Sequence, residues 1–137
     1  DARALADRWY QRRSPEEDAG MELVALNRAF AHWNELGMEG LVLYVDGQPV
    51  AMTMGSPLSG DTFDVQFEKG LDFADGAYPA ICWEFSRYLQ AKYPHLQWLN
   101  REEDMGIEGL RKAKLAYCPD HMVEKWWACL LEDGCDY

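Results

Sequence analysis

The chain has 137 residues, 48 % of them hydrophobic and 13 % aromatic, which predicts one domain with a hydrophobic core and excludes a disordered protein. Its formal net charge of -11 disfavours broad nucleic-acid binding, because phosphate contacts need a basic surface. It contains no run of 18 apolar residues, so we expect no membrane span or anchor in this chain.

Cysteine and histidine spacing bears on metal and redox chemistry. None of the four cysteines forms a C-x-x-C pair, and the three histidines have no ligand spacing with them. We therefore expect no metal site and no disulfide framework, and we interpret Cys82 and Cys129 as buried reduced thiols. This predicts a reducing, cytoplasmic location. The missing initiating Met suggests a piece excised from a longer protein.

Two helices are predicted at the start of the chain. The first covers residues 1–13, and the second opens at the Ser-Pro-Glu-Glu capping box of residues 14–17. Gly37 is its predicted C-terminal stop. The inner face of the second helix repeats at a spacing of three and four, with Leu23, Leu26, Phe30 and Trp33.

Strands are predicted next. Residues 40–45 and 50–54 flank Asp46-Gly47, which is a strong hairpin signal. Residues 62–68 alternate, and this places three apolar side chains on one face of the strand: Phe63, Val65 and Phe67.

The remaining pattern alternates helices with short strands. Asp75 is the predicted cap of a helix over 78–92, with an inner stripe of Ile81, Phe85 and Tyr88 or Leu89. The other predicted elements are a strand at 97–99, a helix at 106–114, and final strands at 116–118 and 124–131. This order predicts an α+β domain with a mixed, mainly antiparallel sheet flanked by helices.

The segment 99–119 reads Leu-Asn-Arg-Glu-Glu-Asp-Met-Gly-Ile-Glu-Gly-Leu-Arg-Lys-Ala-Lys-Leu-Ala-Tyr-Cys-Pro. Acids before a helix and bases toward its end suit the helix dipole, which explains part of the pattern. It does not explain Lys114, which falls between Ile107 and Leu110 on the apolar face at about 100° per residue. That lysine either extends its ammonium to the edge of the face or serves a site.

The motif Asn-Arg-Glu-Glu-Asp-x-Gly-x-x-Gly-Leu-Arg-Lys-x-Lys-x-x-Tyr-x-Pro resembles the bacterial proteins related to the C-terminal domain of phosphatidylglycerol lysyltransferase, the DUF2156 group. Phe67-Glu68-Lys69 and Gly76-Ala77-Tyr78 resemble the same group, and the resemblance spans residues 23–126.

This resemblance implies an acyltransferase fold of the GCN5-related (GNAT) type, and the order of predicted elements matches that fold without its first strand. It also implies that residues 1–137 form one GNAT-like domain, the C-terminal half of a tandem protein whose N-terminal GNAT-like unit is its partner. The missing strand either precedes Asp1 in the parent or is replaced by the neighbouring unit. An incomplete sheet edge predicts an exposed apolar patch or a homodimer.

Two segments are expected to meet where the strands of an open sheet diverge, which is a common ligand position. In the first, Glu68 is a candidate base or amine ligand and Lys69 a candidate phosphate or carboxylate ligand. Alternation allows only one of them to face a cleft unless the strand end splays. Gly76 and Tyr78 open a helix whose N-terminal N–H groups could bind an anion, with Tyr78 also a candidate acid.

The second segment carries Asn100, Arg101, Glu102, Glu103 and Asp104. The three acids are candidate bases, because neighbouring carboxylates raise one another's pKa, and Asn100 and Arg101 are candidate substrate ligands. The alternative is that Glu103 and Asp104 only cap the next helix and pair with its cations.

Arg111 and Lys114 lie one turn apart and could clamp an acidic group such as a phosphate. The related lysyltransferases carry a second Lys two residues after the first, where this chain has Ala116, so lysyl transfer to phosphatidylglycerol does not carry over. The chain also lacks the glycine-rich pyrophosphate loop of acetyl-CoA-binding relatives, which predicts weak acetyl-CoA binding.

Together the residues and the resemblance predict acyl or aminoacyl transfer to an amine or hydroxyl by direct attack. The donor would be an acyl-CoA or an aminoacyl-tRNA. The alternative is a non-catalytic GNAT-fold domain that binds a ligand or a partner. The clustered opposite charges favour transfer, whereas the missing phosphate loop favours the alternative.

Overall fold

The computed structural model describes residues 1–12, 17–71, 75–126 and 128. The chain divides into two compact units, residues 1–102 and residues 103–137, which are described separately.

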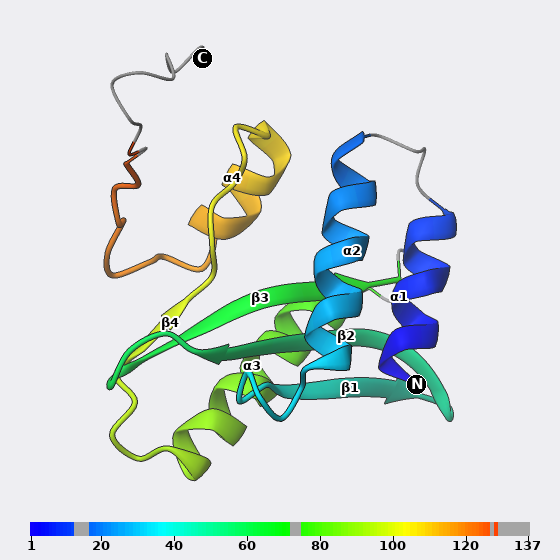
Figure 1. Cartoon of the computed structure of the whole chain (residues 1–137), viewed down its shortest axis with the longest axis horizontal. Helices are drawn as coiled ribbons and strands as arrows, with labels where there is room; N and C mark the ends of the chain where they lie inside the picture. Colours follow the sequence, from blue (N-terminus) through cyan, green and yellow to red (C-terminus); the bar gives the residue numbers. More distant parts are fainter. Residues whose placement is uncertain (13–16, 72–74, 127, 129–137) are drawn as a thin grey trace. The chain divides into compact units, whose positions relative to one another are not determined.

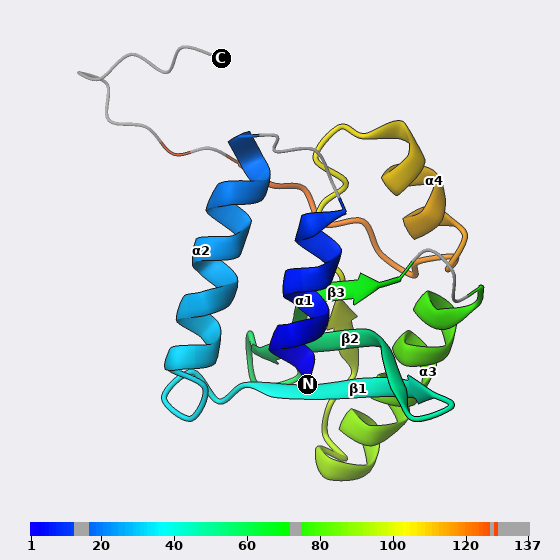
Figure 2. The same ribbon diagram turned by 90° about the vertical axis from the view of Figure 1, so that its right-hand side faces the viewer.

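The first unit is built on a four-stranded sheet of order β1-β2-β3-β4. The strands β1, β2 and β3 pair antiparallel, and β4 pairs parallel to β3. The helices α1 and α2 cover one face of the sheet and α3 covers the other (Figures 1 and 2). The bounds are α1 Ala2–Gln11, α2 Glu17–Ala31, β1 Glu39–Val45, β2 Gln48–Pro57, β3 Thr62–Gly70, α3 Ala77–Lys92 and β4 Trp98–Asn100.

Local sequence signals account for the hairpin between β1 and β2. Asp46 and Gly47 both have positive φ, 49° and 76°, which is the type I′ geometry that the Asp-Gly pair predicts. The predicted stop at Gly37 is displaced from the helix end, because α2 ends at Ala31. Gly37 instead sits at φ 62° in the turn that leads into β1. The predicted capping box at residues 14–17 includes residues outside the described part of the chain.

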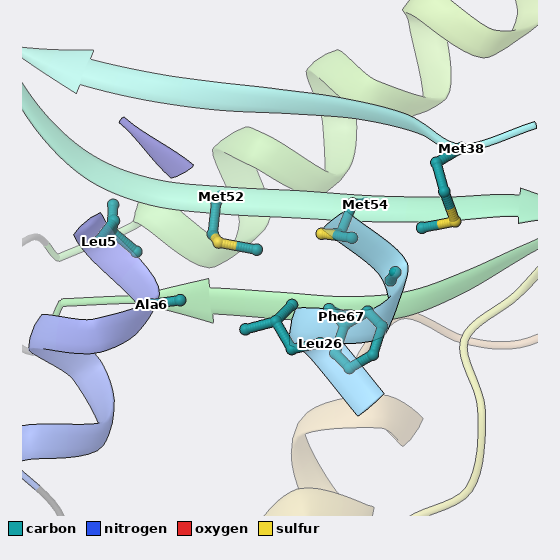
Figure 3. Close-up of a cluster of buried hydrophobic side chains, with 8 residues drawn as sticks. Leu5, Ala6, Leu26, Met38, Met52, Met54 and Phe67 are labelled. Carbon is teal, nitrogen blue, oxygen red and sulfur yellow. The ribbon is translucent and has the colours of Figure 1, made fainter. Parts of the chain in front are cut away.

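Two hydrophobic layers pack on the two faces of the sheet. On the α1 and α2 face, side chains from both helices meet methionines of β2 (Figure 3); the labelled members are Leu5, Ala6, Leu26, Met38, Met52, Met54 and Phe67. On the α3 face, the predicted stripe of Ile81, Phe85 and Leu89 is buried, as expected from its spacing. Phe85 there packs edge-on against Phe63.

The prediction that Phe63, Val65 and Phe67 share one face is wrong. Met54 pairs with Phe67 but Gly55 pairs with Val65, so Gln66 is an extra residue and β3 carries a bulge. Phe63 and Val65 pack on the α3 side, whereas Phe67 packs on the α1 and α2 side. The bulge therefore reverses the facing of every residue that follows it, including Glu68 and Lys69.

The predicted cap of α3 is also wrong. The N-cap is Gly76, in the left-handed conformation at φ 78°, and no side chain caps the helix. A glycine reaches this conformation without the steric cost that Asp75 would meet there. Asp75 therefore lies one residue outside the cap position.

The second unit contains α4, Glu108–Leu115, close to the predicted helix. The predicted strand at 116–118 is wrong, because Ala116 and Tyr117 form a turn and Cys118 has φ 50°. Of the strand predicted at 124–131, residues 124–126 and 128 are irregular and the others lie outside the described residues.

Candidate functional site

An ion pair lies where β3 and β4 diverge. The Arg101 Nη2 atom donates to Glu68 Oε1 at 2.7 Å. Glu68 comes from the C-terminal half of β3, and Arg101 follows the last residue of β4. Pairing between the two strands involves only residues 62–64 of β3, so β3 continues beyond the end of β4. The two side chains are 11 % and 25 % exposed, which makes this a largely desolvated but reachable charge pair.

A third element contributes Thr53 from β2. Its Oγ1 atom donates to Glu68 Oε2 at 3.4 Å, and the residue is 1 % exposed. The sequence reasoning missed this residue. The available signal was a hydroxyl in the middle of the apolar run Val50-Ala51-Met52-Thr53-Met54, where a buried polar group needs a partner.

Lys69 does not join this pair. The bulge places it on the opposite face of the sheet, where its Nζ atom lies 2.5 Å from Glu22 Oε1 and 4.0 Å from the centre of the Trp9 ring. Burial and the nearby Glu22 carboxylate raise the pKa of Tyr10, which belongs to the same cluster. These contacts tie α1 and α2 to β3, a structural task for a buried ammonium.

Gly76 and Tyr78 lie at the start of α3. The first turn of α3 contains no acidic residue and has no side-chain cap, so its N-terminal dipole is not offset there by a carboxylate of the helix itself. A Cβ at Gly76 would meet nothing within 4 Å, so the approach to this backbone is open among the described residues. The Tyr78 ring packs on Gly70, and its hydroxyl donates to the Gly70 carbonyl at 3.4 Å.

Asn100 and Glu102 shape the turn that follows β4. The Glu102 N–H donates to Asn100 Oδ1 at 2.8 Å, and Glu102 has φ 57°. Asn100 thus stabilises the backbone next to Arg101, a common role for asparagine in turns.

The remaining candidates belong to the second unit. Arg111 donates two hydrogen bonds to Asp104, from Nε to Oδ2 at 2.5 Å and from Nη2 to Oδ1 at 3.2 Å. The Gly106 N–H donates to Asp104 Oδ1 at 2.9 Å. The Arg111 hydrogen bonds and then the Gly106 N–H lower the pKa of Asp104 to about 2, and the charge of Lys114 adds to the effect. Glu103 lies 3.8 Å from Lys125. Of the alternative role, the structure shows the pairing of Asp104 with Arg111 but not the capping, because the N-cap of α4 is Ile107 and no side chain caps the helix.

The described residues contain no group of three or more His, Cys, Asp or Glu that could hold a metal ion. Within the same part of the chain, no helix has the length and apolar character needed to cross a membrane.

A family model, "Phosphatidylglycerol lysyltransferase, C-terminal", matches residues 1–129. The chain belongs to this family. A conserved protein of unknown function from Bacteroides thetaiotaomicron is 44 % identical, with a TM-score of 0.72, over 78 % of this chain. The match covers 35 % of the Bacteroides protein, so this chain corresponds to about a third of that protein's length. No curated protein matches the sequence.

Two more distant structures identify the fold. A ribosomal-protein-alanine N-acetyltransferase from Brucella melitensis biovar Abortus is 15 % identical with a TM-score of 0.57, over 94 % of this chain and 88 % of that one. An aminoglycoside 6′-N-acetyltransferase from Acinetobacter haemolyticus is 14 % identical with a TM-score of 0.58, over 96 % and 97 % of the two chains. This chain therefore has the predicted α+β fold, which is the fold of the GNAT N-acetyltransferases.

Proposed function

We propose that this domain transfers an acyl or aminoacyl group directly from a donor to an amine or hydroxyl acceptor. The observation that carries the proposal is the Glu68–Arg101 ion pair at the divergence of β3 and β4. Membership in a lysyltransferase family and the transferase fold support the same reaction class.

In this mechanism the Glu68 carboxylate receives the proton that the acceptor loses as its nitrogen or oxygen attacks the donor carbonyl. The new C–N or C–O bond replaces the C–S or C–O bond to the donor. Glu68 then passes the proton to the departing sulfur or oxygen, so that the donor leaves as thiol or alcohol and the carboxylate is restored. Arg101 orients the Glu68 carboxylate through the hydrogen bond between them. No covalent bond to the protein forms.

Glu68 fits the base better than Asp104 does. A carboxylate whose pKa is held near 2 is a weak base, since general-base efficiency requires a pKa closer to the working pH. Arg111 and the Gly106 N–H hold Asp104 within the turn before α4. We therefore assign Asp104 and Arg111 to holding the turn before α4, and we keep Glu102 and Glu103 as secondary candidates.

The start of α3 is the proposed position of a donor phosphate. An uncapped helix N-terminus attracts anions, and Gly76 leaves its backbone accessible. Either an acyl-CoA or an aminoacyl-tRNA would supply such a phosphate. We further propose that the domain is the C-terminal half of a tandem protein and works next to an N-terminal GNAT-like unit.

The test is a transfer assay with radiolabelled acetyl-CoA and, separately, a labelled aminoacyl-tRNA, each with a panel of amine and hydroxyl acceptors. We expect Glu68→Gln to lower kcat at least about a hundredfold with one donor, because it removes a general base. Glu84→Gln is the control, because Glu84 forms a similar but exposed pair with Arg87 on α3. Equal rates for Glu68→Gln and the unmodified protein would refute the proposal.

The second candidate is a non-catalytic ligand-binding domain, favoured by the absence of a glycine-rich pyrophosphate loop in the sequence. Calorimetry with acetyl-CoA and with an aminoacyl-adenosine mimic separates the two. Binding of either compound without transfer to any acceptor would favour this second function.

A further inference from the structure

Thr53 is a buried hydroxyl at the centre of the sheet, and the contacts around it give it a task beyond packing. We infer that Thr53 is a positioning residue that orients the Glu68 carboxylate toward the acceptor. This inference rests on the proposed function, because it assigns a role relative to the proposed base.

The placement of Thr53 follows from the strand register. Thr53 is the direct cross-strand partner of Glu68 on one side and of Leu41 on the other. Leu41 packs into the layer beneath α3, and Ala51, two residues before Thr53, packs against the start of that helix. The Thr53 hydroxyl therefore points into an apolar layer, where Glu68 is the hydrogen-bond partner that the strand register provides.

The two contacts to Glu68 act on different oxygen atoms. Arg101 donates to Oε1 and Thr53 donates to Oε2. A single donor would leave the carboxylate able to rotate about its terminal bond, whereas donors on both oxygens define its plane. At 3.4 Å the Thr53 contact is long for a hydrogen bond, so Arg101 at 2.7 Å is the stronger of the two donors.

The bulge makes this arrangement available. In a regular strand, Glu68 would face away from Phe63 and so away from α3. The extra residue Gln66 returns Glu68 to the α3 face, directly beside Thr53. The positioning pair therefore depends on the bulge that follows the next cross-strand pair, Met54 and Phe67.

The first test needs no substrate. The Glu68 carboxyl is followed by ¹³C NMR through a pH titration in the unmodified chain, Thr53→Val and Thr53→Ser. Valine keeps the volume of threonine but cannot donate, so a purely structural role predicts an unchanged titration. Loss of a donor to the charged form instead moves the Glu68 midpoint to higher pH, and serine restores it.

Thr62→Val is the matched control, because the Thr62 hydroxyl donates to Asp61 at 2.9 Å, away from Glu68. It should leave the Glu68 titration unchanged. A Glu68 midpoint that is the same in Thr53→Val and in the unmodified chain would overturn the positioning role.

The second test uses the transfer assay. Thr53→Val should lower kcat about tenfold with little change in KM for the donor, and Thr53→Ser should retain nearly full activity, because misorientation acts on the chemical step. If Glu68→Gln is inactive while Thr53→Val is fully active, the positioning role fails and the proposed base stands. If Glu68→Gln is fully active, the proposed function fails, whatever the NMR titration of Thr53→Val shows.

Discussion

At the scale of single residues, the same functional group acquires different tasks from its surroundings. Glu68 and Asp104 are both carboxylates held by an arginine, but they differ in exposure and in what else they accept. Asp104 also accepts the Gly106 N–H, which locks a turn. Glu68 accepts a threonine hydroxyl within a sheet and stands next to an edge of β3 that β4 does not cover.

The Asp104 turn gives a pH prediction. Its pKa in the folded chain, about 2, lies below the ordinary value of 3.8. A lowered folded pKa contributes stability above the unfolded value, so the contribution is present above about pH 4 and is lost as pH falls toward 2. The amide proton of Gly106, which reports this hydrogen bond by NMR, should titrate with a midpoint near pH 2.

The control for this titration is Asp104→Asn, which keeps the shape of the side chain but has no proton to gain. In that variant the Gly106 amide shift should be nearly flat between pH 5 and pH 2. If the Gly106 amide shift instead had its midpoint close to pH 4 in the unmodified chain, Arg111 would not be stabilising the Asp104 carboxylate.

At the scale of secondary-structure elements, the bulge in β3 decides which face each later side chain occupies. The bulge requires a glycine at position 55, because a Cβ there would lie 1.9 Å from the Asp64 carbonyl oxygen. No L side chain tolerates such a separation from backbone, so β2 and β3 would have to move apart.

Gly55→Ala should therefore destabilise the chain by about 3 kcal/mol or more, measured by urea unfolding. Gly60→Ala is the matched control, because a Cβ there meets nothing within 4 Å, and it should change stability by less than about 1 kcal/mol. Equal midpoints for the two variants would mean that the strands do not approach this closely.

Glu39 links the start of β1 to the end of α3. It accepts hydrogen bonds from Tyr88 at 2.6 Å and Tyr93 at 2.8 Å, and it pairs with Lys92. Burial opposes ionisation of Glu39, but the donors from Lys92, Tyr88 and Tyr93 outweigh it and lower the pKa of this carboxyl.

Glu39→Gln should cost about 2 kcal/mol at pH 7, because it removes the charge that strengthens three hydrogen bonds. The lowered pKa means that this contribution is present above the ordinary carboxyl pKa and is lost as pH falls through the lower folded value. The difference in unfolding free energy between the two proteins should thus shrink in acid. A difference that stays constant from pH 7 to pH 3 would argue against the charge as its source.

These elements show what the sequence could predict. The Asp-Gly hairpin and the buried stripe of Ile81, Phe85 and Leu89 depend on short-range patterns, so the sequence predicts both correctly. The bulge at Gln66 depends on how β2 and β3 pair across the sheet, and alternation along one strand carries no such information. The assumption of strict alternation misplaced Phe67 for that reason.

In the candidate site too, the sequence predicts what short-range patterns carry and not what depends on pairing between strands. The motif pointed to Glu68 and Arg101, and the structure brings them together at 2.7 Å because β3 and β4 are neighbours. Lys69 adjoins Glu68 in sequence but faces the opposite side of the sheet. Thr53 was missed because it belongs to another strand, and its partner is identified only by the register.

At the scale of the whole molecule, the sheet that the described residues form has two edge strands, β1 and β4. Within the described residues, β1 pairs with β2 alone. Backbone groups along the other edge of β1 are then available to another strand, the usual route to edge-to-edge association. In a tandem parent, a preceding strand or the neighbouring unit could cover this edge.

We predict that the isolated chain self-associates through β1, forming an antiparallel β1–β1 contact about a two-fold axis. Sedimentation velocity should show an average mass that rises with concentration, and alternate β1 amides should exchange more slowly at high concentration. Val45→Lys should weaken the association, because Val45 is 50 % exposed on β1 and a lysine on an edge strand disfavours pairing with another strand. Met21→Lys introduces the same charge at a 77 % exposed position on α2, away from the sheet edge, and should leave the association intact. A single monomeric species at all concentrations, with unprotected outward-facing β1 amides, would show that this edge does not pair.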